Sequence, residues 1–113
     1  MKTNTLKNHL RTHRNRSGLS QREVALLLDR EQEEVSRHER AMAMPSLVAG
    51  LCYQEVFRVS LVDLFPGIHT HVAQRIESKL DTLEDELGQR SARDPRANAV
   101  AKKLMWLKER KAR

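Results

Sequence analysis

The stretch from Ser20 to Ala41, SQREVALLLDREQEEVSRHERA, constrains the fold most, because it holds two helical patterns that differ in how much they can bury. The first begins at Ser20, has Glu23 at the third helical position as in a capping box, and continues with a dense apolar run. The second, EQEEVSRHER, has Val35 as its lone central hydrophobe. Such a helix can bury only a narrow stripe, so most of its surface must face water or a partner.

Glycine, proline and serine divide the flanking sequence into further helices. A first basic helix ends at Gly18, because glycine accepts the positive φ of a helix C-terminus. Another helix, LVAGLCYQEVF, begins after Ser46. Ser60 caps a short piece, LVDLF, and Pro66-Gly67 closes the unit. No pattern indicates a β-strand, so the sequence predicts an all-α fold.

Two more helices are expected beyond Gly67. The first has a brief heptad seam and ends near Gly88, with a break at SARD. Asp94 and Pro95 suit the N-cap and first turn of the second, which is rich in Lys and Arg. The apolar positions are Ile76, Leu80, Leu83 and Leu87 in the first helix and Ala97, Val100, Ala101, Leu104 and Leu107 in the second. The expected domains are therefore residues 1–67 and a helical extension at 68–113.

Charge is distributed unevenly along the 113 residues. The net charge of +6 favours a polyanionic partner such as nucleic acid. Residues 1–22 hold six basic residues and no acid, and residues 90–113 hold nine basic residues against two acids. Residues 23–39 reverse the balance with six acids against two arginines. The basic surfaces are thus expected at the two ends.

Several protein classes are disfavoured. One cysteine excludes an intrachain disulfide and fits a reducing compartment, and no run resembles a signal peptide or a membrane span, so we expect a cytoplasmic protein without a membrane partner. HLRTH, from His9 to His13, has the spacing of half a zinc finger, but no cysteine pair precedes it. No phosphate loop, nucleophile motif or metal-ligand set is present, so we expect no enzyme, no cofactor and no metal.

A short helix, a tight turn and a second helix with one inner hydrophobe is the plan of a helix-turn-helix. With the following PSLVAGLCYQEVFRVSLVDLF, this stretch resembles the phage Cro and repressor helix-turn-helix family, often called the XRE type. The resemblance covers roughly residues 6–67 and rests on Ser20-Gln21, Ala25, Leu28, Val35, Ser36-Arg37, Glu39-Arg40, Pro45-Ser46-Leu47 and Val59-Ser60-Leu61. It implies a five-helix Cro/repressor-like domain that binds double-stranded DNA.

The resemblance also implies roles for single residues. Gln21 would touch a phosphate and brace the recognition helix, and Arg14 would pair with Glu39. Base and backbone contacts would come from the outer face of the third helix. The full expected DNA-binding set is Gln21, Arg22, Gln32, Glu33, Ser36, Arg37 and Arg40. Glu33 is expected to accept a hydrogen bond from cytosine and so to add selectivity.

Five positions depart from the family pattern. Asp29, Ala41 and Arg58 stand where glycine is usual, and because Ala and Arg adopt positive φ less readily, these junctions are expected to be rebuilt. His38 replaces a usual aromatic residue and Gln54 a usual small one, which predicts altered packing.

The resulting functional prediction is a transcriptional regulator, a repressor that binds a palindromic operator as a homodimer through its extension. The alternative is a protein-interaction module that uses the acidic third helix. The extension could instead fold back on its own domain, and the basic last helix could grip flanking DNA or lie on an acidic membrane. His69 and His71 are expected to lie in a solvated linker.

Overall fold

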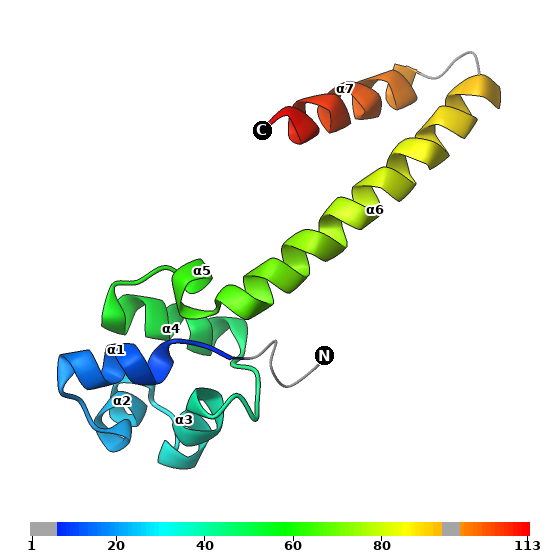
Figure 1. Cartoon of the computed structure of the whole chain (residues 1–113). Coiled ribbons are helices and arrows are strands. Elements are labelled where there is room, and N and C mark those ends of the chain that lie inside the picture. Colours follow the sequence, from blue (N-terminus) through cyan, green and yellow to red (C-terminus); the bar gives the residue numbers. More distant parts are fainter. Residues whose placement is uncertain (1–6, 94–97) are drawn as a thin grey trace. The chain divides into compact units, whose positions relative to one another are not determined.

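The computed structural model describes residues 7–93 and 98–113, and all secondary structure in these ranges is helical (Figure 1). The predicted all-α class is therefore confirmed. The helices are α1 (Leu10–Ser17), α2 (Gln21–Leu28), α3 (Gln32–Glu39), α4 (Leu47–Phe57), α5 (Leu61–Leu64), α6 (Pro66–Arg93) and α7 (Asn98–Ala112). The chain divides into two compact units between His71 and Val72. This division lies inside α6, four residues after the domain boundary expected at Gly67.

The first unit contains a small bundle of α1 to α5 (Figure 1). These helices pack around one apolar core. Helices α1 and α2 each pack against α3 and α4. Val35, the lone central hydrophobe of α3, is fully buried, which ties α3 to the core by a narrow stripe as expected. The core consists of Leu10, Val24, Ala25, Leu28, Val35, Tyr53, Leu64 and Phe65.

Serine side chains start three of these helices. Ser20 Oγ accepts a hydrogen bond from the backbone N–H of Glu23 at 3.1 Å, and the Glu23 carboxylate accepts from the Ser20 N–H at 2.8 Å, which completes the predicted capping box. The second of these hydrogen bonds lowers the pKa of Glu23. Ser46 and Ser60 cap α4 and α5 with the side chain alone, which accepts a hydrogen bond from the backbone N–H of the third residue of each helix. All three predicted starts are confirmed.

The junctions that lack the usual glycine keep the conformation that glycine would adopt. Asp29, Ala41 and Arg58 have φ of 55°, 59° and 57°, close to the 76° of Gly18 at the end of α1. The expectation that these junctions would be rebuilt is wrong. Each N–H still donates to a carbonyl of the preceding helical turn, as Arg58 does to Gln54 at 2.8 Å. These bonds hold the turns although a side chain in this region costs about 1–2 kcal/mol.

Replacing Arg58 by glycine should therefore raise the free energy of unfolding by roughly 0.5–1 kcal/mol, because relief of the Cβ clash exceeds the added freedom of the unfolded chain. Arg58 is exposed, so no packing is lost. Urea unfolding followed by circular dichroism measures the change. Glu55→Gly, also exposed but inside α4, is the control and should lower stability by about 1 kcal/mol. A loss of stability in both variants would contradict the strain argument.

The second unit is an antiparallel pair formed by the later part of α6 and by α7. Lys111 Nζ, near the end of α7, lies 2.8 Å from Asp81 Oδ1 and 2.9 Å from Glu84 Oε2 on α6. Arg110 lies 3.5 Å from Glu77. The apolar side chains buried in this unit are Leu80 and Leu87 of α6 and Val100 and Leu107 of α7. The predicted seam is therefore covered only in part, since Leu83 is half-buried and Ile76 is 44% exposed.

Helix α6 differs from the expectation at both ends. Pro66 begins the helix instead of closing the unit, because its fixed φ suits the first helical position. The helix passes Gly88, where an added Cβ would meet nothing within 4 Å, and continues to Arg93, so no break occurs at Ser91 to Arg93. His69 and His71 are exposed on this helix and do not form a linker. The expected cap at Asp94-Pro95 and the apolar Ala97 lie outside the described residues.

Candidate nucleic-acid interface

Helix α3 has one buried face and one open face. Val35 and His38 are buried, whereas Gln32, Glu33 and Arg37 are exposed and Ser36 is half-buried. The open face follows from helical periodicity, because Gln32 and Ser36 lie one turn apart, as do Glu33 and Arg37. Four of the seven predicted site residues therefore lie on one helix surface. Arg22 is exposed in the first turn of α2.

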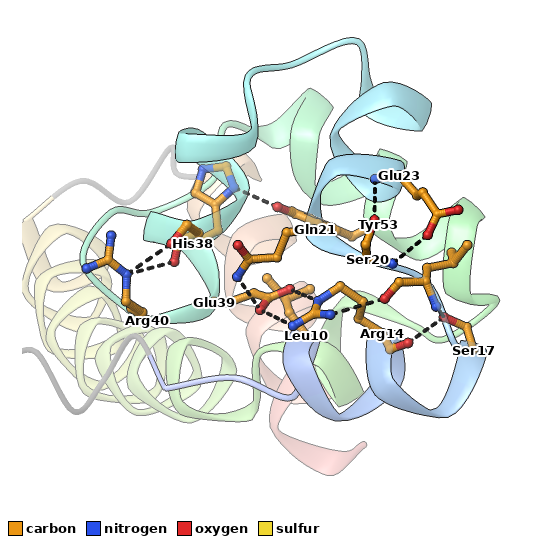
Figure 2. Close-up of polar contacts among 12 residues, drawn as sticks. Leu10, Arg14, Ser17, Ser20, Gln21, Glu23, His38, Glu39, Arg40 and Tyr53 are labelled. Carbon is orange, nitrogen blue, oxygen red and sulfur yellow. Dashed lines mark hydrogen bonds and ion pairs between the residues drawn. The ribbon is translucent and has the colours of Figure 1, made fainter.

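A buried ion pair joins the end of α3 to α1 and α2 (Figure 2). Arg14 donates to both carboxylate oxygens of Glu39, from Nε at 2.6 Å and from Nη2 at 3.1 Å. Gln21 Nε2 donates to the same carboxylate at 3.1 Å, and Arg14 Nη1 donates to the Leu19 carbonyl at 3.1 Å. The Glu39 side chain is only 4% exposed. The expected Arg14–Glu39 pair and the bracing contact of Gln21 are both confirmed.

Arg40 lies along the open face of α3 and reaches back to its acidic first turn. Its Nε donates to Ser36 Oγ at 3.2 Å, and its Nη2 lies 3.3 Å from Glu33 Oε1. Arg30 pairs likewise with Glu34 at 3.3 Å. Exposed pairs of this kind add little stability, but they neutralise two of the carboxylates that would oppose a polyanion. The ion pair between Glu33 and Arg40 was not predicted from the sequence, although their spacing of seven residues, two helical turns, could have indicated it.

Three arginines surround a hollow of about 300 Å³ lined by Arg11, Arg14, Gln21, Glu39 and Arg40. The residues come from the first helix, the start of the second and the end of the third. Because Arg14 already neutralises Glu39, the cations left over are Arg11 and the weakly paired Arg40. The hollow therefore suits an anion such as a phosphate group. Arg11 was absent from the site predicted from sequence.

His38 seats α3 on α4 through a hydrogen bond to Tyr53. His38 Nδ1 and Tyr53 Oη lie 2.8 Å apart, and the two side chains are 4% and 1% exposed. Their rings meet edge to face (Figure 2). Burial lowers the pKa of His38, an effect that the Glu34 carboxylate partly opposes, and burial raises the pKa of Tyr53. His38 thus keeps the place of an aromatic ring and adds a polar contact.

Gln54, where altered packing was also expected, makes a hydrogen bond to the backbone instead of an apolar contact. Gln54 is half-buried, and its Oε1 accepts a hydrogen bond from the backbone N–H of Leu61 at 3.0 Å. The amide therefore satisfies a free donor at the start of α5.

The remaining histidines and the cysteine belong to other elements than α3. His13 is half-buried with its ring 6.2 Å from that of Phe57, and His9 is the N-terminal cap residue of α1. Cys52 packs against the apolar core. Within residues 7–93 and 98–113, no three His, Cys, Asp or Glu side chains gather where they could hold a metal ion. None of the described helices is long and apolar enough to cross a membrane.

Comparison of the chain with protein-family models, curated proteins and solved structures gave no match.

Proposed function

We propose that this protein is a sequence-specific regulator of transcription that binds double-stranded DNA with a Cro/repressor-like helix-turn-helix of the XRE type. Helices α2 and α3 form the motif, and α3 is the recognition helix. One observation carries the proposal: a short helix buries only Val35 and His38, is fixed at its end by Glu39, and leaves Gln32, Glu33 and Arg37 open. A helix held rigidly with a polar outer face is what major-groove binding requires.

The chemistry of the open face assigns a role to each side chain. The Arg37 guanidinium can donate two hydrogen bonds to the O6 and N7 atoms of guanine, and Gln32 can pair with adenine. Glu33 can accept from the exocyclic amine of cytosine, which requires its ion pair with Arg40 to open. Arg40 would then be free for a phosphate in the hollow that it shares with Arg11 and Gln21.

The proposed regulator is a homodimeric repressor with a palindromic operator. Two copies would read half-sites about 34–36 Å apart, one turn of DNA. The second unit supports such an interface because apolar side chains on α6 stay exposed beyond its covered seam. Val72 is 48% exposed and Ile76 is 44% exposed.

The proposal is tested by selecting bound duplexes from a randomised pool with the whole chain at two salt concentrations. We expect a palindromic sequence with half-sites one turn apart. Sequence-blind binding that disappears with salt would contradict the proposal and favour a protein partner for α3.

Two arginine variants separate base reading from backbone contact. Arg37→Ala should weaken binding to the selected duplex by about 1–3 kcal/mol, roughly 5- to 150-fold, and should relax selectivity at one base pair. Arg40→Ala should weaken all duplexes alike and lower the slope of log affinity against log salt by about one. Fluorescence anisotropy with matched and mismatched duplexes measures both effects. Identical behaviour of the two variants would be inconsistent with these roles.

A further inference from the structure

One flank of α7 combines basic side chains with an exposed tryptophan. Lys102, Lys103, Trp106 and Arg110 follow one another at spacings of one, three and four residues, so they share a flank of the helix. The buried Val100 and Leu107 lie on the adjoining face of the helix, next to Lys103 and Arg110. Lys102 and Lys103 are exposed, and Trp106 is 52% exposed.

The cations on this flank are largely uncompensated. Arg110 makes one long contact of 3.5 Å to Glu77, and both side chains are well exposed, so this pair is weak. In the part of the chain that the structure describes, no carboxylate forms an ion pair with Lys102 or Lys103. Lys111 differs, because its hydrogen bonds to Asp81 and Glu84 raise its pKa and hold it against α6. The ion pairs that join the two helices thus leave Lys102 and Lys103 available and hold Arg110 only weakly.

The chemistry of the flank favours a nucleic acid over a membrane surface. A helix that lies on a membrane inserts a continuous apolar face. In α7 the side chains Val100 and Leu107 are already buried in the second unit. On the flank itself Trp106 is the one apolar side chain, and its neighbours are cations. The cations suit the phosphate backbone of a nucleic acid, and the indole ring suits its sugars or base edges.

We propose that the α7 flank, formed by Lys102, Lys103, Trp106 and Arg110, is a second DNA-binding surface that contacts the phosphate backbone without reading sequence. The proposal rests on the proposed function for the choice of duplex DNA as the polyanion. It assigns to the basic C-terminal region a share of the affinity that the acidic recognition helix cannot supply.

Trp106 reports on this surface directly, because it is the sole tryptophan in the chain. A duplex of unselected sequence added to the whole protein should change the fluorescence of Trp106, and added salt should reverse the change. Lys103→Glu should weaken binding of that duplex at least about fivefold near 0.15 M salt and lower the salt slope by about one, as expected for one lost phosphate contact.

Lys108→Glu is the matched control, because Lys108 is exposed on the same helix but points away from the flank. It changes net charge by the same amount and should have less than half the effect of Lys103→Glu on the logarithm of the affinity. Equal effects of the two variants, or an unchanged Trp106 signal, would overturn the proposal. A Trp106 blue shift with phosphatidylglycerol vesicles but no response to DNA would also overturn it and indicate a membrane surface.

The Arg37→Ala variant separates this proposal from the proposed function. It should lose base selectivity while Trp106 still responds to duplex DNA. If the duplex pool yields a selected sequence but Trp106 is silent, the α7 proposal alone fails. If Trp106 responds and no sequence is selected, the α7 surface stands and the proposed function fails.

Discussion

Replacing Arg14 by alanine is expected to lower the free energy of unfolding by about 3–5 kcal/mol, because it leaves a buried charge without its partner. The side chains of Arg14 and Glu39 are 14% and 4% exposed, so water replaces little of what the carboxylate loses. Gln21 would remain as its one other side-chain donor. Small domains have a total stability of about 5–15 kcal/mol, so this loss would bring the first unit near unfolding. Urea denaturation measures it.

The double variant Arg14→Met with Glu39→Leu is the control for this prediction. Removing both charges replaces the ion pair with apolar contacts of similar size, which is often neutral or stabilising. The double variant should therefore be more stable than Arg14→Ala. A loss below about 1 kcal/mol for Arg14→Ala would mean that the pair acts as an ordinary surface ion pair.

Acidification is expected to weaken the fold through His38. Burial lowers the pKa of this side chain in the folded protein, so the unfolded chain binds more protons as the pH falls through the ordinary histidine range. The stability contributed by neutral His38 is complete above about pH 6.5, the pKa of an unperturbed histidine, and is lost as the pH falls below that value. The slope can reach about 1.4 kcal/mol per pH unit.

The His38→Phe variant isolates this effect. Phenylalanine fills a similar volume but cannot bind a proton, and it leaves Tyr53 Oη without its partner at every pH. Its free energy of unfolding should therefore be lower than that of the parent protein near neutral pH. The difference between the two free energies of unfolding should become smaller on acidification, because only the parent loses stability through His38. Stability measured by urea unfolding at several pH values tests this. A difference in the free energy of unfolding between parent and variant that stays constant from pH 7.5 to pH 5 would show that His38 is not the group that titrates.

The sequence was most informative where a local signal decides the structure. Ser20, Ser46 and Ser60 each satisfy a backbone donor three residues ahead, so the starts of α2, α4 and α5 could be located from short motifs. The polar face of α3 followed from one hydrophobe, Val35, in a helical pattern. The Arg14–Glu39 pair was implied by resemblance and not by any local rule.

Features that depend on residues distant in the chain could not be predicted from the sequence. Ala41 and Arg58 have weak intrinsic preference for positive φ, yet their backbone hydrogen bonds to the preceding helical turn outweigh that preference. The partner of His38 is fifteen residues away on α4, and no short motif joins the two. Gly88 marks a helix end only when the chain must turn there, and an exposed glycine inside a long helix costs only about 1 kcal/mol.

The serine caps also bear on how this chain folds. Each of the three helix starts is defined by atoms within four residues, before any long-range contact forms. Bundles whose contacts are mostly local have low contact order and reach the native state quickly, typically in microseconds to milliseconds. A newly made first unit would therefore spend little time with its apolar core exposed, and its nucleation would depend on short segments rather than on the meeting of distant parts of the chain.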